Sequence, residues 1–270
     1  MNPTAVIIVR DMPGFETLKV DRGGGVVTVT MNRPEKKNAI DQQMTEELIE
    51  VLTEVKATED DRVMVLTGAG GEFCSGADLT PASSRSGSGL GSMRRVSELV
   101  LAIHGQPQPT IAKVDGVAAG LGANMALGCD LIVASDRARF SEIFAKRGLT
   151  IDGGGSWLLP RLIGLHRAKE LAFFADILSA EEAAEFGIVN RVVPARELDA
   201  FVDDWAARLV AGPPLSLSMT KALLNASAGM SMIDAVEREA VAQALNFSTA
   251  DTAEAMLAFV QKRAPEFKGR

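Results

Sequence analysis

Hydrophobic and polar positions follow two different periods along the first part of the chain. Phe15–Val20 and Val26–Met31 are short apolar or alternating runs typical of strands, and the glycines between them predict a hairpin turn. After Asp41, which can cap a helix, apolar residues from Met44 to Val55 recur every three or four positions and predict an amphipathic helix. Further buried strands and helices alternate beyond it, so the pattern predicts an α/β layered core.

A glycine-rich turn lies near the centre of the chain, directly after the predicted buried strand Thr110–Val114. Gly116, Gly120 and Gly122 leave almost no side-chain bulk there, and residues with good helix propensity follow from Ala123. Unpaired N–H groups at such a helix start can bind an anionic oxygen, but a tight turn with close helix packing explains the same glycines equally well. The spacing matches neither a dinucleotide fingerprint nor a nucleotide phosphate loop.

Beyond residue 155 the pattern becomes mostly helical. Ser179 and Glu182 have the spacing of a capping box, and one short strand is predicted at Ile188–Val193. No internal repeat is sharp enough to indicate a solenoid. We therefore divide the chain into an α/β core over residues 1–193 and a helical subdomain over residues 194–270.

Composition and charge restrict the class of function. The chain has 270 residues, 47% of them hydrophobic, and its net charge of −7 argues against a nucleic-acid partner. No apolar run is long enough for a membrane span, and two cysteines without a signal-peptide pattern favour a cytoplasmic protein. No His or Cys cluster has metal-ligand spacing, and tyrosine is absent. Carboxylates and backbone dipoles are therefore the expected catalytic groups.

Three motifs in order connect the chain to a known family. The chain resembles the enoyl-CoA hydratase/isomerase family, also called crotonases, in Ser75-Gly-Ala-Asp-Leu79, Val114-Asp-Gly-Val-Ala-Ala-Gly-Leu-Gly122 and Gly153-Gly-Gly-Ser-Trp-Leu-Leu-Pro-Arg-Leu162. A fourth segment, Phe259-Val-Gln-Lys262, is similar to the end of that family's chains. The resemblance implies a core of repeated ββα units, a C-terminal helical region for trimerisation, acyl-CoA thioester substrates, and no cofactor beyond the substrate's own CoA. A homotrimer or hexamer is the assembly it implies.

The resemblance also implies where the thioester and CoA bind. In the family two backbone N–H groups bind the thioester oxygen, and the matching positions here are Ala77 and Leu121. Such donors stabilise the charge that enolisation places on the oxygen by about 2.7–4 kcal/mol each. The positions that match CoA-binding residues are Arg33 or Lys37, Ala39, Ala77, Leu79 and, from a neighbouring subunit, Phe259 and Lys262. By pattern alone, Lys37 belongs to a solvated pair with Lys36, and Phe259 to the core face of a helix.

The chain departs from the hydratase pattern at both catalytic positions. Hydratases of this family hold water between two glutamates, and the aligned positions are Asn124 and Phe144, neither of which can act as a base. Asn124 can still orient a water or a substrate group through its amide. Glu142, two residues before Phe144, takes the second position only if the local alignment is shifted.

Asp152 is the remaining acid near these motifs. Its place resembles that of the acid used by double-bond isomerases and some other non-hydratase members of the family. A carboxylate partly desolvated by Trp157, Leu158 and Phe144 would have a raised pKa, which suits a group that takes and returns a proton. The same residue also fits a helix N-cap before Gly153, a role that would stabilise the anion and make it a poorer proton carrier.

Three functions are consistent with these residues. The favoured one is the conversion of 3-enoyl-CoA to 2-enoyl-CoA, or a related one-base rearrangement such as that of a ring epoxide, with Asp152 as acid and base. The second is a 2-enoyl-CoA hydratase of the fatty-acid β-oxidation type that uses Glu142 or Asp152, with Asn124 placing water. The third is a CoA-thioester-binding protein that has lost catalysis.

Overall fold

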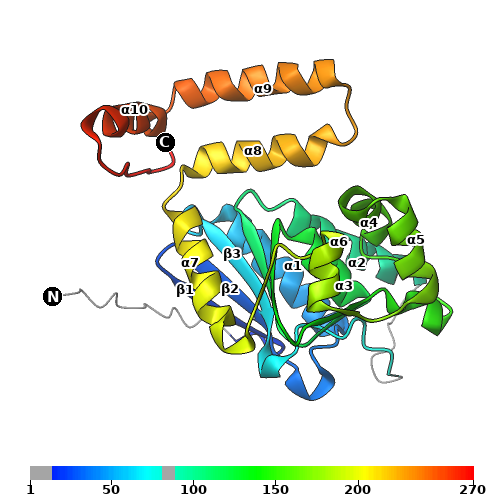
Figure 1. Cartoon of the computed structure of the whole chain (residues 1–270). Helices are drawn as coiled ribbons and strands as arrows, with labels where there is room; N and C mark the ends of the chain where they lie inside the picture. The colour runs from blue at the N-terminus through cyan, green and yellow to red at the C-terminus, as the bar shows by residue number, and fades with distance from the viewer. Residues whose placement is uncertain (1–13, 81–88) are drawn as a thin grey trace.

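The computed structural model describes residues 14–80 and 89–270 and has two sheets at its centre (Figure 1). The larger sheet has the order β1-β2-β3-β4-β6-β9, in which β1 and β2 form an antiparallel hairpin and the other neighbours run parallel. Its strands are Leu18–Gly23 (β1), Val26–Met31 (β2), Val63–Gly68 (β3), Thr110–Val114 (β4), Leu131–Ser135 (β6) and Arg191–Val193 (β9). The smaller sheet, β5-β7-β8, consists of Val117–Ala119, Arg139–Ser141 and Leu178–Ser179.

Helices cover both faces of the larger sheet. The described α-helices are Gln42–Ala57 (α1), Gly89–His104 (α2), Leu121–Gly128 (α3), Gly155–Ile163 (α4), Leu165–Phe174 (α5), Ala180–Phe186 (α6), Leu198–Val210 (α7), Pro214–Ser227 (α8), Met232–Phe247 (α9) and Ala250–Gln261 (α10), of which the last three do not cover the sheet. In β3, Met64 and Leu66 belong to the main core with α1, α2 and α3, whereas Val63 and Val65 pack against α7. The two-residue period of a strand thus places both faces in contact with helices.

The predicted α/β class and the ββα order are confirmed, and the differences lie at element boundaries. β1 runs to Gly23 because the hairpin needs only Gly24 and Gly25, both at positive φ, for its turn. β5 stands between β4 and the glycine-rich helix start, and β8 is a strand that the sequence did not predict. The predicted strand at Ile188–Val193 forms only over its last three residues. The stretch 81–92 is rich in serine and glycine, a composition that predicts a loop, and it lies mostly outside the described residues, but α2 begins inside it, at Gly89.

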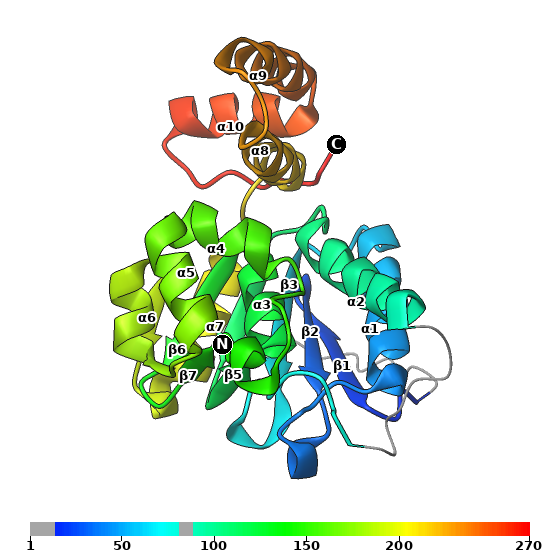
Figure 2. The same cartoon turned by 90° about the vertical axis from the view of Figure 1, so that its right-hand side faces the viewer.

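The last three helices stand apart from the core (Figures 1 and 2). None of the residues of α8 and α9 is buried, whereas α7 buries Leu198, Val202 and Ala206 against the larger sheet. Lys221 of α8 joins the arm to the core through an ion pair with Asp130 at 2.7 Å. The division expected at residue 194 therefore precedes the last helix of the core, and the separate helical arm begins at α8. No helix in the described ranges is long and apolar enough to cross a membrane.

Candidate active site

Two segments that are far apart in sequence meet at the start of α3. The Cys74 N–H donates to Val117 O at 2.8 Å and the Ala119 N–H donates to Cys74 O at 2.9 Å, so Cys74 forms a parallel bridge with Ala118 of β5. The Gly120 N–H donates to Ser141 O at 2.8 Å and fixes the turn that follows β5. These bonds place the segment around Ala77 against the first turn of α3.

Two glycines allow the close approach of these segments. A Cβ on Gly122 would lie 2.4 Å from Cys74 O, and one on Gly76, whose φ is +99°, would lie 2.9 Å from Ala119 O. The same Gly76 position is 3.8 Å from the Leu121 nitrogen, so the two predicted oxyanion donors, Ala77 N–H and Leu121 N–H, are brought together. Neither group donates a hydrogen bond to another described residue. This arrangement can bind a developing oxyanion.

Asn124, one turn into α3, connects the two candidate acids. Its side chain is fully buried, and its Nδ2 donates to Glu142 Oε2 at 3.2 Å and to the Asp152 backbone oxygen at 2.9 Å. Burial raises the pKa of Glu142 to about 8, the hydrogen bond from Asn124 lowers it, and the charge of Asp152 raises it further. Asn124, Glu142 and Asp152 therefore form one cluster beside Leu121.

Asp152 does not cap the helix that follows it. Gly154, two residues after Asp152, is the N-cap of α4, and the Asp152 backbone oxygen accepts from the Gly155 N–H at 3.0 Å. The N-cap interpretation of Asp152 is therefore wrong. Its side chain is half-buried, and the next residue packs against the start of α3, since a Cβ on Gly153 would lie 3.0 Å from the Leu121 side chain.

Phe144 and Trp157, two aromatic residues of this region, pack against other parts of the structure. Phe144 is buried, and a Cβ on Gly120 would lie 3.6 Å from its ring, so Phe144 packs beneath the oxyanion turn. The Trp157 ring contacts His104, with ring centroids 5.5 Å apart, and the Arg161 guanidinium at 3.9 Å. Phe144 therefore has a structural contact where a hydratase would have its second glutamate.

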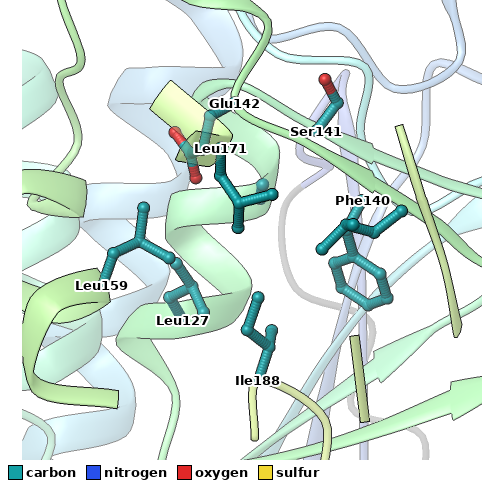
Figure 3. A pocket seen from close by; sticks show the side chains of 9 residues that line it. Leu127, Phe140, Ser141, Glu142, Leu159, Leu171 and Ile188 are labelled. Carbon is teal, nitrogen blue, oxygen red and sulfur yellow. The ribbon is translucent and has the colours of Figure 1, made fainter. Parts of the chain in front are cut away.

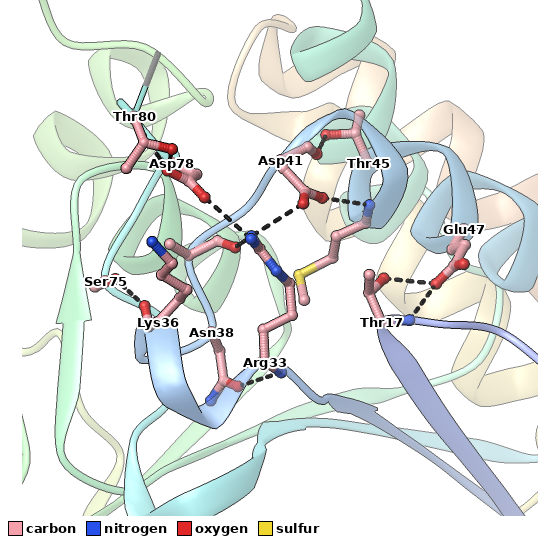
Figure 4. Close-up of polar contacts among 12 residues, drawn as sticks. Thr17, Arg33, Lys36, Asn38, Asp41, Thr45, Glu47, Ser75, Asp78 and Thr80 are labelled. Atoms are coloured by element: carbon pink, nitrogen blue, oxygen red, sulfur yellow. Dashed lines mark hydrogen bonds and ion pairs between the residues drawn. The ribbon is translucent and has the colours of Figure 1, made fainter. Parts of the chain in front are cut away.

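Arg33 holds the predicted CoA loop together (Figure 4). Its guanidinium donates to Ala39 O at 2.5 Å and pairs with Asp41 at 3.1 Å and with Asp78 at 3.0 Å. With its side chain 16% exposed, Arg33 is neutralised by two carboxylates and ties the loop to the segment that carries Ala77. Arg33 therefore positions the loop, and of the two cations considered for the CoA phosphates, Lys37 is the more accessible.

Lys37 reaches solvent at the rim of the same region. Its side chain is 57% exposed and pairs with Glu72 at 3.0 Å, and its backbone oxygen accepts from the Ser75 N–H at 3.0 Å. Leu79, 65% exposed, lies on the segment that Arg33 anchors, and Ala39 is buried in the loop. An exposed ion pair contributes little to stability, so Lys37 can exchange its partner for a phosphate at small cost.

We expect Lys37→Ala to weaken substrate binding without affecting the chemical step. Loss of one charge-assisted phosphate contact should raise KM for a CoA thioester by about fivefold to tenfold, with kcat nearly constant. Steady-state kinetics and competition by free CoA measure this effect. Lys36→Ala, the same change at the neighbouring exposed residue, is the matched control and should alter KM by less than about twofold. Equal effects of the two substitutions would show a general charge effect rather than a phosphate contact.

Phe259 and Lys262 are not brought to this site within one chain. Both belong to the end of α10, in the arm that stands apart from the core, and Phe259 is 85% exposed (Figure 1). Their predicted contact with CoA therefore requires a second copy of the chain.

The described cysteines and His104 lack the features of a catalytic nucleophile or base, and no described cluster could bind a metal ion. Burial raises the pKa of the Cys74 and Cys129 thiols to about 12, which keeps both protonated at neutral pH. Burial lowers the pKa of His104, and its ring packs on Trp157 rather than on an acid. The described residues contain no group of three His, Cys, Asp or Glu side chains that could hold a metal ion.

Comparisons with known proteins agree with this fold. The sequence profile described as enoyl-CoA hydratase/isomerase matches residues 21–270. The 1,2-epoxyphenylacetyl-CoA isomerase of Escherichia coli K12 is 38% identical, over 91% of this chain and 96% of its own, and the short-chain-enoyl-CoA hydratase of Clostridium acetobutylicum is 33% identical, over 93% and 97%. The crystal structure of an enoyl-CoA hydratase from Bacillus anthracis superposes with a TM-score of 0.91 at 30% identity, covering 94% of this chain and all of that one.

Proposed function

Because the chain belongs to the enoyl-CoA hydratase/isomerase family, we propose that it shifts a double bond in an acyl-CoA thioester, from the 3-enoyl to the 2-enoyl form. Related one-base enolate rearrangements, such as that of a ring epoxide, would use the same groups. One observation supports the proposal: the two hydratase glutamate positions hold Asn124 and Phe144, while Asp152 is joined through its backbone oxygen to Asn124, three residues after the proposed donor Leu121. A single acid next to an oxyanion site is sufficient for a proton transfer between two carbons.

The reaction needs one base and two backbone donors. The Asp152 carboxylate removes a proton from C2 of the 3-enoyl thioester, and the electron pair moves onto the thioester oxygen. The N–H groups of Ala77 and Leu121 stabilise the resulting dienolate. Protonated Asp152 then returns the proton to C4, the double bond forms between C2 and C3, and the carboxylate is regenerated.

Hydration is the second candidate, and a specific contact favours it. Asn124 Nδ2 donates to the Glu142 carboxyl and to the Asp152 backbone oxygen, and the charge of Asp152 acts on Glu142, so two acidic residues lie near one amide that could orient a water. A hydratase would use both carboxyls, whereas an isomerase needs only Asp152. Binding of acyl-CoA without turnover of any 2-enoyl, 3-enoyl or epoxy thioester would instead identify the protein as a non-catalytic member of the family.

Turnover of matched substrates decides among these candidates. The wild-type protein is given 3-enoyl-CoA and 2-enoyl-CoA thioesters of the same acyl chain, and products are separated by chromatography. Fast conversion of the 3-enoyl substrate with slow hydration of the 2-enoyl substrate supports the isomerase. The opposite order of rates would contradict the proposal and favour the hydratase.

We also propose that the active protein is a homotrimer or hexamer whose site is completed by a neighbouring subunit. The arm supports this proposal because it exposes large apolar side chains that the chain itself does not cover. They include Leu224, Met232, Ile233, Phe247, Met256, Phe259 and Val260. A neighbour that binds the arm would bring Phe259 and Lys262 to its own CoA site.

Mixed oligomers test the shared site. Asp152→Asn chains lack the base and Lys262→Ala chains lack the CoA contact, yet a mixed oligomer contains sites with Asp152 from one chain and Lys262 from the next. After dissociation and reassociation of a 1:1 mixture, we expect roughly a quarter of the sites to be intact in a cyclic assembly. At low substrate concentration the activity should then exceed the sum of the two separate variants. Activity equal to that sum would show that Lys262 acts within its own chain or not at all.

A further inference from the structure

Glu142 is a buried carboxyl that one-base isomerisation does not use. It follows β7, is 5% exposed, and accepts from Asn124 Nδ2 through Oε2. Sequence alignment gave it a role only if the register was shifted, yet the structure places it in direct contact with the residue that touches the Asp152 segment. The position of Glu142 can therefore affect the position of Asp152, the proposed base.

Apolar side chains from several elements surround the other side of Glu142 (Figure 3). They line a small cavity together with Ser141 and comprise Ala123, Leu127, Phe140, Leu159, Leu171, Leu178 and Ile188. The volume open to the centre of a water molecule in this cavity is about 20 Å³, which is enough for one water. No cation is among the residues that line it, and no described positive group shifts the pKa of Glu142.

The charge state of Glu142 follows from these surroundings. Burial holds its pKa at about 8, and of the described charged groups only Asp152 contributes, by raising it. At pH 7 the carboxyl is therefore neutral, and its carbonyl oxygen can still accept the hydrogen bond from Asn124.

Asn124 transmits the position of Glu142 to Asp152. Its Nδ2 holds the Asp152 backbone oxygen, and a Cβ on Gly155 would lie 2.6 Å from its Oδ1, so the segment that carries the base packs directly on the amide. A Cβ on Gly153 would likewise lie 3.1 Å from Asn124 Cβ. A shift of Asn124 would therefore move the segment that carries Asp152.

We propose that Glu142 is a positioning residue that acts as a neutral acid, holding the Asp152 segment through Asn124, and that its ionisation inactivates the enzyme at alkaline pH. The inference rests on Asp152 as the base of the proposed function. An ionised Glu142 would place a second negative charge near Asp152 inside an apolar cavity. Repulsion from Asp152 and the demand for water around the anion would then shift the Glu142 carboxylate, and Asn124, whose N–H donates more strongly to the anion, would move with it.

Glu142→Gln tests the proposal because glutamine copies the neutral acid and cannot ionise. Above pH 8 the wild-type kcat/KM should fall about tenfold per pH unit, whereas the variant should keep its value up to the pH at which the protein unfolds. At pH 7 the variant should lose no more than about threefold, and Glu142→Ala, which removes the acceptor of Asn124, should lose at least about tenfold. The proposal would be overturned if kcat/KM fell above pH 8 in the same way in the wild type and in Glu142→Gln. It would also be overturned if Glu142→Gln lost more than about 100-fold in kcat/KM at every pH, because Glu142 would then be a proton carrier.

A second measurement needs no substrate and separates this proposal from the proposed function. The folded pKa of Glu142 lies above its unfolded value, so the wild type should lose stability relative to Glu142→Gln as pH rises from about 4.5 to 8. The thermal midpoints of the two proteins should then diverge over this window and stay parallel above it. In the Asp152→Asn background, the thermal midpoints with and without Glu142→Gln should stop diverging at a lower pH, because the charge of Asp152 no longer raises the pKa of Glu142. Parallel curves from pH 4.5 upward would refute a neutral Glu142 even if no isomerase activity were found.

Discussion

Asp152→Asn should lower kcat for a 3-enoyl-CoA thioester by about 10³-fold while leaving KM nearly unchanged. Asparagine keeps the size of the side chain, but it cannot accept the C2 proton. The bond from Asn124 goes to the backbone oxygen of residue 152 and is preserved in the variant, so the segment should keep its position. The predicted loss therefore belongs to the proton transfer and not to folding.

The control for Asp152→Asn is the binding of a saturated acyl-CoA, which offers no double bond to move. Its dissociation constant, measured by calorimetry, should match that of the wild type within about twofold, because the CoA contacts and the oxyanion donors are intact. Exchange of the C2 proton with deuterated water gives a direct reading of the base and should stop in the variant. Full exchange of the C2 proton and unchanged turnover in Asp152→Asn would show that another residue is the base. Loss of exchange in Glu142→Gln would then identify Glu142 as that base.

The parts of the fold that the sequence predicted are those governed by local periodicity. β2 and β4 occur where apolar runs were found, and the Met44 N–H donates to Asp41 at 2.9 Å as an N-cap should. These features depend on residues that are close in sequence, so a pattern of a few residues is sufficient. The arm boundary was harder to place, because α7 and α8 both have helical spacing and only the contact of α7 with the sheet tells them apart.

The site was predictable only where glycine or a family motif marked it. Gly76 and Gly122 are required by distances to Cys74 and β5, and both belong to the motifs that carry the resemblance. The bridge from Asn124 to Glu142 has no such signal, since it joins α3 to a segment 18 residues later through one side-chain bond. The pairing of Arg33 with Asp78 joins residues 45 positions apart and likewise could not be predicted from the sequence pattern. Long-range polar contacts of single side chains leave no period in a sequence.

Leu121→Pro should remove one oxyanion donor while preserving the fold, with a fall in kcat of about 10²–10³-fold. Leu121 is the first residue of α3, a position where proline is favoured because its missing N–H has no partner within the helix. The residue before proline must be extended, and Gly120, with φ 53° and ψ −123°, has the mirror image of that conformation, which glycine adopts without strain. The backbone is thus already shaped for the substitution.

Leu121→Ala is the matched control because it removes the same buried side chain and keeps the N–H. Both variants should lose stability, by about 2–5 kcal/mol for the lost packing, and thermal melting checks that they do so alike. Only Leu121→Pro should lose the donor, so the ratio of the two kcat values measures the replacement of that N–H by the proline ring carbon. If both variants are equally slow, the thioester oxygen is bound by Ala77 and another group. A large ratio would instead show that the first amide of α3 stabilises the enolate, as the approach of Gly76 to the Leu121 nitrogen indicates.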